Sequence, residues 1–471
     1  AYFMPRNFHL CFFGLRHLGL DSSIRVMDYL RIFYYLNVSN ELPVDSGFHV
    51  AYNLITQAMN KTDDLAFYLT IPWEYFDYAA KKFREWIGER VSLVPIFNLP
   101  HYSMNKLVLP IIFREFFRKR IIHIFFINEP HLFPTFFSFL EASFLSRTPI
   151  VFYFHWFMFK PFYRSKMKDF YRKYLSAIFS GDFYVGVNSQ YSLKILDHHQ
   201  VKYSEENLYI CPPGFNKDHM VSARKERKLL VFNQRVSKYT GAPVVLKALA
   251  EQKYDLRFIF TNSRNLLASS IKRKAEKRNK IAFFYGLPEE EYYKLLGKAG
   301  GVMCWHEPYV NQWSIALCEA VASRCLPVIH DDVFYPELLG NIPRYSGKSL
   351  VERLKEYEEN YQNLRRNFDF SYVERWSWEK VADRWIKMFY DAWESGKVAK
   401  KTHYRRLMRF RKIMPSISRL RLAYEKLFGS TQFTTKMTYL SRYIREDRLY
   451  EDVDGIWYIH DFDGWLEEFL E

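Results

Sequence analysis

The chain alternates short apolar runs of strand length with longer segments of helical periodicity. In its first half these runs predict strands at residues 27–38, 65–72, 92–98, 121–128, 149–157, 183–189 and 207–213. The segments between them fit amphipathic helices. Strands and helices that alternate in this way form a parallel sheet, because each helix carries the chain back to the edge where the next strand begins.

A second alternating series begins after a charged segment. The segment "FNKDHMVSARKERK" (215–228) lacks strand character, and we interpret it as a linker. The strands predicted beyond it lie at residues 229–235, 256–262, 281–286, 301–305 and 326–331, and the helices at about 241–252, 265–278, 288–299 and 313–323. The sequence therefore predicts two α/β halves with a cleft between them, where ligands bind beyond the carboxyl ends of the strands.

The pattern changes after "YVERWSWEKVADRWIKMFYDAW" (372–393), which has strong helical periodicity. Residues 397–426 contain eleven Lys or Arg and the single acid Glu425. The remainder predicts a helix at about 433–445 and two strands around "VDG". We therefore divide the chain into residues 1–214, 215–371, 372–396 and a basic tail at 397–471.

Composition sets limits on this picture. The 471 residues are 49% hydrophobic, enough to bury two sizeable cores. A net charge of +16 favours a polyanionic partner, which means nucleic acid, an anionic membrane face or phosphorylated small molecules. The cysteines show neither metal-ligand spacing nor the density of a disulfide framework, so we expect a reducing compartment and no zinc site. They are Cys11, Cys211, Cys304, Cys318 and Cys325.

The most apolar region lies at residues 121–145 and is interrupted by polar residues and two prolines. It falls short of the roughly 20 continuous apolar residues that span a bilayer. No signal peptide is evident, so we expect a soluble or at most peripheral protein.

Several strand ends in the second half carry residues suited to chemistry. "LLVFNQRVSKYTGAPVVLKALA" ends a strand at Arg235 and places Lys238 before the next helix. "IAFFYGLPEEEYYKLLGKAGGVMCW" has Gly286 in a turn, and "NQWSIALCEAVASRCLPVIHDD" puts Glu319 on an otherwise apolar helix. In order and spacing these motifs resemble those of retaining glycosyltransferases of the GT-B fold, the family that includes glycogen synthases. The resemblance implies an α/β fold in which two Rossmann-like domains face a cleft, with residues 1–214 on the acceptor side and 215–371 binding a nucleotide sugar.

The resemblance also implies roles for individual residues. Arg235 and Lys238 would face the donor diphosphate and stabilise the leaving group, although only two residues separate them where the family has four. Gly286 would let the backbone approach the base or ribose. Glu319 would hold the ribose hydroxyls, and the amides that begin its helix could hold phosphate oxygens.

Position 311 departs from the family pattern. The family has an acid there, eight residues or roughly 12 Å along a helix before the glutamate, and this chain has Asn311. An amide can bond a sugar hydroxyl but carries no charge. Glu307 is a candidate for the missing carboxylate.

The first half adds two resemblances. "LPVDSGFHVAYNLITQAM" (42–59) is similar to the family's glycine loop and helix near the donor phosphate, with Gly47 at the glycine. "PIVFYFHWF" (149–157) places His155 at a strand end, where family members carry a histidine near the transferred sugar. Residues 372–396 resemble the family's closing helix, which returns to the first domain.

The implied reaction transfers a hexose with retention from a UDP- or GDP-sugar, and needs neither a metal ion nor any other cofactor. The donor diphosphate would itself accept the proton of the acceptor, while cations and helix amides stabilise it. With a reducing compartment expected, we place the protein in the cytoplasm, or in the host cytoplasm if it is viral.

The tail provides the clue to the acceptor. Three short helices and a hairpin resemble a winged helix-turn-helix, whose third helix enters a DNA groove. Candidate contacts to nucleic acid are Arg405, Arg406, Arg409, Thr434, Thr435, Lys436, Thr438 and Arg442. This arrangement favours a modified base in DNA as acceptor, as in viral DNA glucosyltransferases. A helical cap with a solvated basic face is the alternative for the tail.

Two other functions stay open. Residues 106–126 are basic and apolar, and could anchor a peripheral enzyme that modifies a lipid or polysaccharide. The amide at Asn311 and the short spacing from Arg235 to Lys238 also fit a non-catalytic DNA-binding protein with a degenerate sugar-nucleotide domain.

Overall fold

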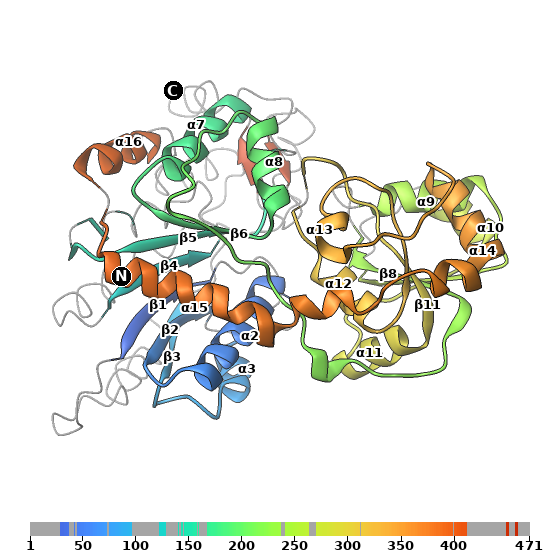
Figure 1. Ribbon diagram of the computed structural model, residues 1–471, viewed down its shortest axis with the longest axis horizontal. Coiled ribbons are helices and arrows are strands. Elements are labelled where there is room, and N and C mark those ends of the chain that lie inside the picture. The colour runs from blue at the N-terminus through green and yellow to red at the C-terminus, as the bar shows by residue number, and fades with distance from the viewer. Residues whose placement is uncertain are drawn as a thin grey trace, which may run out of the picture. The chain divides into compact units, whose positions relative to one another are not determined.

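A computed structural model of the chain shows two larger β-sheets, each built from parallel strands that are connected by helices (Figure 1). It describes residues 29–36, 42, 45–72, 75–96, 122–128, 140, 143–144, 146–157, 159, 167–236, 241–262, 270–310, 312–398, 400–411, 449–451 and 457–459. The described residues form two compact units. The first takes its residues from Ala1–Tyr153, Asp182–Tyr184 and Ile386–Thr435, and the second from Phe154–Gly181, Val185–Trp385 and Lys436–Glu471.

The first sheet has seven strands in the order β3-β2-β1-β4-β5-β6-β7. Their bounds are β1 Leu30–Tyr35, β2 Leu65–Pro72, β3 Val91–Ile96, β4 Ile124–Asn128, β5 Ile150–Phe154, β6 Tyr184–Val187 and β7 Leu208–Ile210. Every strand predicted in the first half is confirmed. Strands β4 and β5 are buried along their whole length, which explains why they read as continuous apolar runs.

Helices α2 (Ser46–Lys61) and α3 (Phe76–Lys82) belong to the first unit. Asp45 caps α2 by accepting a hydrogen bond from the amide of Phe48 at 3.0 Å. At the other end of α2, the buried Arg90 donates hydrogen bonds to the carbonyl oxygens of Met59, Leu65 and Thr62. The guanidinium thereby satisfies the carbonyls of Met59 and Thr62 at the end of the helix, and also ties that end to β2 through Leu65.

The second sheet has five strands in the order β10-β9-β8-β11-β12, all parallel. The strands are β8 Glu226–Arg235, β9 Arg257–Asn262, β10 Lys280–Phe283, β11 Ala299–Met303 and β12 Leu326–Val328. The helices of this unit are α7 Met167–Phe179, α8 Gln190–His198, α9 Ala242–Glu251, α10 Ser270–Arg278, α11 Glu289–Lys298, α12 Ile315–Ala322, α13 Tyr335–Leu339 and α14 Leu350–Arg366. Helix α9 packs against both α10 and α14 (Figure 1).

The linker predicted at residues 215–228 is only partly correct. Strand β8 begins at Glu226, and a short 3-10 helix occupies Lys217–His219. The first three residues of β8 are charged and exposed, so they carry no apolar signal. They belong to the strand because the backbone pairs with β11, where Ala299 lies opposite Glu226.

Helix α15 (Trp378–Ser395) confirms the helix predicted near 372–393. Its residues from Ile386 onward belong to the first unit. There the ring of Phe389 packs edge-on against Phe126, 5.2 Å between centroids, and against Phe67 at 6.1 Å. The end of the helix is therefore anchored in the core beside β2 and β4.

The described part of the tail contains helix α16 (Lys401–Arg411) and strands β13 (Leu449–Glu451) and β14 (Trp457–Ile459). The two strands pair antiparallel, which confirms the predicted hairpin. The helix predicted at 433–445 lies outside the described residues, as does the segment 106–126. Among the described residues, no helix combines the length and apolarity needed to cross a bilayer.

Candidate functional site

The candidate residues of the second half that the structure describes lie toward the carboxyl edge of the five-stranded sheet. Arg235 is the last residue of β8, and Glu307 lies in the loop after β11, the neighbouring strand. The loops after these two strands touch, because a Cβ at Gly241 would lie 1.7 Å from the carbonyl oxygen of Trp305. The glycine at the start of α9 is therefore required by this close approach. Lys238 and Asn311 lie outside the described residues.

Gly286 lies in the bend after β10, at the same edge and two strands away from β8. Its φ of +66° falls in the left-handed region that favours glycine, and open space surrounds the position of a Cβ. Backbone conformation therefore explains the glycine, and the open space agrees with the predicted approach of a ligand.

The loop between β11 and α12 is held by buried polar groups. Ser314 caps α12 by accepting a hydrogen bond from the amide of Leu317 at 3.1 Å. Gln234, the residue before Arg235, donates hydrogen bonds to Ser314 Oγ and to Cys304 Sγ. Burial raises the pKa of the Cys304 thiol to about 12, so this sulfur stays protonated and acts as a packing group.

Glu319 is half-buried on α12, and both its oxygens accept hydrogen bonds. Tyr292 donates to Oε2 at 2.7 Å and Tyr293 donates to Oε1 at 2.8 Å. Tyr292 also accepts from the side chain of Asn233 at 3.0 Å, which links the glutamate to β8. Burial, together with the charge of Glu319, raises the pKa of both phenols, so both remain hydrogen-bond donors.

A second buried cluster surrounds His306. Its Nδ1 lies 2.9 Å from the hydroxyl of Tyr335, and its carbonyl accepts from His330 Nε2 at 2.7 Å. Burial lowers the pKa of His306 to about 3 and also lowers that of His330. Both imidazoles are therefore neutral near pH 7 and position the loop rather than carry charge.

The same loop is tied to α8 within the second unit. Ser189 donates to the backbone carbonyl of Gln312 at 2.9 Å, and Ser192 donates to its side-chain oxygen at 2.8 Å. The ring of Tyr309 stacks on His198 with centroids 3.9 Å apart, at a positive φ of 58°. The loop that leads into α12 is thus fixed on two sides.

The predicted residues of the first half sit at other strand and helix ends. His155 directly follows β5 and is half-buried, and its carbonyl accepts a hydrogen bond from Asn188 at 2.6 Å. Gly47 is the second residue of α2, just inside the cap formed by Asp45. The position of His155 at the end of a buried strand matches the prediction, whereas Gly47 lies in the first turn of the helix rather than in the predicted loop before it. The roles of both residues stay predictions.

The candidates for nucleic-acid binding are placed only in part. Arg405 and Arg406 are exposed on α16, which also contains Arg409. Lys436 and Arg442 lie outside the described residues, as do Thr434, Thr435 and Thr438.

The inner face of α16 is anchored in the first unit. His403 Nδ1 lies 2.9 Å from a carboxylate oxygen of Asp182, and Tyr404 stacks on Phe144 with centroids 4.2 Å apart. Partial burial alone would raise the pKa of Asp182, but hydrogen bonds and charge from His403 and Lys400 lower it overall. This packing agrees with a helical cap that presents a basic outer face.

Sequence reasoning missed the groups that hold Glu319. The adjacent tyrosines in "EEEYYKLL" were the available signal, because two hydroxyls beside an apolar helix need partners. Gln234 and Asn233 were hidden inside an apolar strand. Within the described part of the chain, no three or more His, Cys, Asp or Glu side chains come together in an arrangement that could hold a metal ion.

Known structures share the architecture. HepE from Anabaena, crystallised with UDP and glucose, aligns with a TM-score of 0.56 at 13% identity, over 76% of this chain and 99% of that chain. The structure of HepE with UDP-glucose aligns with a TM-score of 0.55 at 14% identity, over 77% of this chain and 100% of that chain. A TarM variant from S. aureus, in complex with Fondaparinux, alpha-GlcNAc-glycerol and UDP, aligns with a TM-score of 0.51 at 10% identity. The alignment covers 76% of this chain and 99% of that chain.

No protein-family model matches the sequence, and no curated protein gives a significant match. The structures above are GT-B glycosyltransferases. At identities this low the similarity establishes architecture only: the chain has the α/β GT-B fold predicted from its motifs.

Proposed function

We propose that this protein is a glycosyltransferase that takes its sugar from a nucleotide-sugar donor bound at the carboxyl edge of the five-stranded sheet. The fold supports this proposal, because HepE has been crystallised with UDP and UDP-glucose. The convergence of Arg235, Gly286 and the loop before α12 at one edge supports it further, since ligands of open α/β sheets bind there.

The observation that carries the proposal is the position of Glu319. The residue lies in the second turn of a helix whose capped N-terminus follows β11 at this edge. The first-turn amides of α12 suit a phosphate, and the glutamate lies farther along the same helix, where a ribose would be.

The tyrosines support this role. A carboxylate offers about four acceptor sites, so Glu319 can accept from Tyr292 and Tyr293 and still accept from a donor hydroxyl. The two phenols fix its orientation before the ligand arrives, which lowers the entropic cost of binding.

In the proposed reaction, Arg235 and Lys238 stabilise the departing diphosphate, and the sugar is transferred with retention and without a metal ion. His155 would contact the transferred sugar, and Gly47 the donor phosphate. Asn311 or Glu307 would bond a sugar hydroxyl. A UDP- or GDP-sugar is the expected co-substrate, with no other cofactor.

For the acceptor we propose a modified base in DNA, bound by the basic tail. The exposed Arg405 and Arg406 of α16 support a polyanion at this surface. The membrane enzyme and the non-catalytic DNA-binding protein are the competing outcomes of the test.

The test measures nucleotide released from a panel of UDP- and GDP-sugars, with and without hydroxymethylated DNA. We expect release from one donor, stimulated by the DNA. Release without stimulation by DNA, but with stimulation by lipid vesicles, would favour the membrane enzyme. If no donor binds or turns over while DNA still binds, the non-catalytic function replaces the enzyme.

Glu319→Gln provides the matched test of the site. It keeps the shape of the side chain and removes the charge that both tyrosines bond, so donor affinity should fall at least tenfold while DNA affinity is unchanged. Glu359→Gln, an exposed glutamate on α14, is the control and should leave donor affinity intact.

A further inference from the structure

Helix α10 carries a dense positive charge on the surface of the second unit. Five of its nine residues are basic and one, Glu276, is acidic. The basic residues are Lys272, Arg273, Lys274, Lys277 and Arg278. Helix α11 differs, because its Lys294 pairs with Glu290 at 2.6 Å and with Glu291 at 3.2 Å. Charge on α10 is therefore not balanced within the helix.

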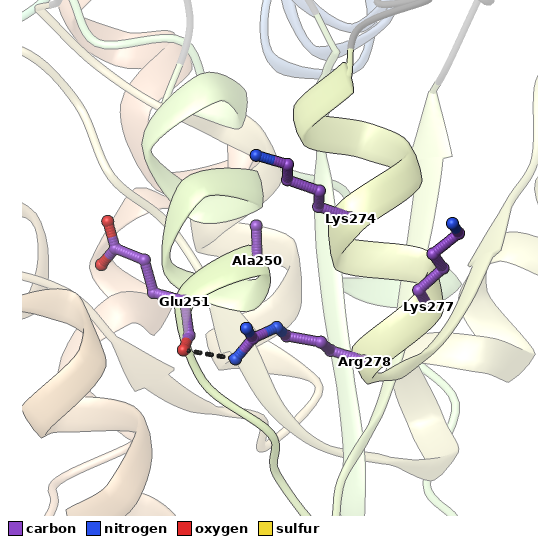
Figure 2. Close-up of a pocket in the computed structure, with 5 residues that line it drawn as sticks. All are labelled: Ala250, Glu251, Lys274, Lys277 and Arg278. Atoms are coloured by element: carbon purple, nitrogen blue, oxygen red, sulfur yellow. Dashed lines mark hydrogen bonds between the residues drawn. The ribbon is translucent and has the colours of Figure 1, made fainter.

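A pocket of about 490 Å³ opens between the C-terminal ends of α9 and α10 (Figure 2). It is lined by Ala250, Glu251, Lys274, Lys277 and Arg278. Arg278 crosses from α10 to donate a hydrogen bond to the backbone carbonyl of Glu251 at 2.9 Å, the dashed line in Figure 2. The guanidinium is thereby held at the pocket with further N–H groups left to donate.

The one acid of the pocket does not neutralise these cations. Figure 2 shows the carboxylate of Glu251 pointing away from Lys274 and Lys277, and its partner is Lys247, 3.9 Å away on the same helix. Neither Lys274 nor Lys277 forms an ion pair with any residue that the structure describes. Like charges three and four residues apart destabilise a helix, and a bound anion would remove that repulsion.

The end of α9 next to the pocket is held by hydrogen bonds to the residue that follows α10. Asn279, which is buried, donates to the carbonyls of Leu249 at 2.6 Å and Gln252 at 2.9 Å, and accepts from the amide of Tyr254 at 2.9 Å. The carbonyls that end α9 are thus already bonded, so they repel an incoming anion less. Of the three cations, Arg278 is fixed by its hydrogen bond to α9.

This pocket lies at the opposite edge of the sheet from the proposed donor site. Helix α9 ends at Glu251 before β9 begins at Arg257, and α10 ends at Arg278 before β10 begins at Lys280. The ends of these helices therefore lie at the amino edge of the parallel strands. Arg235 and Glu319 belong to the carboxyl edge.

We propose that the α9–α10 pocket is a second anion site, which binds a ligand carrying at least two phosphate groups. Arg278 suits one phosphate because its planar fork bonds two oxygens at once, and Lys274 and Lys277 act as point charges for the next. The site stands independently of the proposed glycosyl transfer.

The probe is inorganic tripolyphosphate, titrated calorimetrically into the full chain at about 0.15 M salt, with saturating UMP, which carries a single phosphate, present to occupy the carboxyl edge. We expect saturable binding to the unaltered protein. The double variant Lys274→Glu/Lys277→Glu should bind tripolyphosphate at least tenfold more weakly. The affinity of the milder variant Lys274→Gln/Lys277→Gln should lie between those of the unaltered protein and of the glutamate variant. UMP affinity should not change.

The matched control is Lys355→Glu/Lys380→Glu, which makes the same charge change with exposed lysines on α14 and α15. Its affinity for tripolyphosphate should stay within twofold of the unaltered protein. An equal loss in test and control variants would show attraction by net charge alone and overturn the site, as would unchanged binding in the α10 variants.

A second arm separates the sources of phosphate. Vesicles of phosphatidylcholine with cardiolipin, whose head group carries two phosphates, are tested by co-sedimentation with the same variants. Binding to both probes, lost in the α10 variants, supports the site and identifies lipid head groups as one source. Binding to tripolyphosphate alone supports a soluble ligand. Vesicle binding without tripolyphosphate binding overturns the pocket in favour of a flat membrane contact.

Discussion

Helices α12 and α10 belong to the same unit, but the charged group of α12 is hydrogen-bonded inside the protein and two charged groups of α10 are exposed without an ion-pair partner in the part of the chain that the structure describes. The only charged residue of α12 is Glu319, and both its oxygens are bonded by tyrosines. On α10 the exposed Lys274 and Lys277 have no ion-pair partner among the described residues. Removing a group that is hydrogen-bonded inside the protein leaves its partners unsatisfied and lowers stability, whereas removing an exposed unpaired charge changes stability little. The two helices should therefore respond differently to substitution.

The largest expected effect follows Glu319→Ala. The substitution leaves the hydroxyls of Tyr292 and Tyr293 without their acceptor, and each buried group left unsatisfied costs about 1–3 kcal/mol. We expect the free energy of unfolding to fall by about 2–4 kcal/mol, measured by urea denaturation. Glu359→Ala, on exposed α14, should change it by less than about 0.5 kcal/mol. An equally small change for Glu319→Ala would show that the tyrosines find other partners.

The two tyrosines should then differ from each other. Tyr292→Phe removes a hydroxyl that is bonded to both Glu319 and Asn233, so we expect a loss of about 1–3 kcal/mol. Of these two kinds of bond, Tyr293 makes only the bond to Glu319, so Tyr293→Phe should cost about 0.5–1.5 kcal/mol. Urea denaturation of both variants checks the order. Equal losses would mean that the hydrogen bond from Asn233 to the hydroxyl of Tyr292 contributes nothing measurable to stability.

The contrast between the two helices also shows what sequence could reveal. Apolar runs predicted the strands well, because parallel strands buried on both faces need continuous hydrophobic residues. The start of β8 at Glu226 was missed, since its first residues are exposed and charged. The anomaly of Glu319 on an apolar helix was visible, and so was its position at a sheet edge.

The partners of Glu319 were not predictable in the same way. Tyr292 and Tyr293 lie on α11, and Asn233 on β8, and only the tertiary structure brings them to α12. The basic residues of α10 were part of the net charge of +16, but their pocket depends on the side-by-side packing of α9 and α10. Lys238 and Asn311, on which the family pattern also rests, lie outside the described residues.

On α10, the same kind of substitution should leave stability nearly unchanged. Lys274→Glu/Lys277→Glu replaces like-charge neighbours with pairs to Arg278 and Arg273, and each such pair is worth about 0.2–0.5 kcal/mol. We expect the free energy of unfolding to change by no more than about 0.5 kcal/mol, and less at high salt. A loss of several kcal/mol in urea denaturation would show that the lysines hold the fold rather than a ligand.

The smallest expected effect concerns a third acid, Glu337 on α13. Its oxygens accept from the amides of Gln190 and Tyr191 at 2.8 and 3.0 Å, which caps α8. Burial raises the pKa of this carboxyl, although the two amides partly oppose the shift. A raised pKa means that the folded state binds the proton more tightly than the unfolded chain. The contribution of this proton to the free energy of unfolding is therefore full below the ordinary glutamate pKa, and it is lost as pH rises through the raised pKa of Glu337.

As pH rises from below the ordinary glutamate pKa to above the raised pKa, we expect the unaltered protein to lose a little stability. Glu337→Gln should lose less, because a glutamine does not titrate. The measurement is urea denaturation at closely spaced pH values, comparing the slopes of the two proteins. Glu374→Gln provides the control, since its partner is the exposed Lys217, and it should keep the slope of the unaltered protein. A slope that survives unchanged in Glu337→Gln would contradict the assignment of the titration to Glu337.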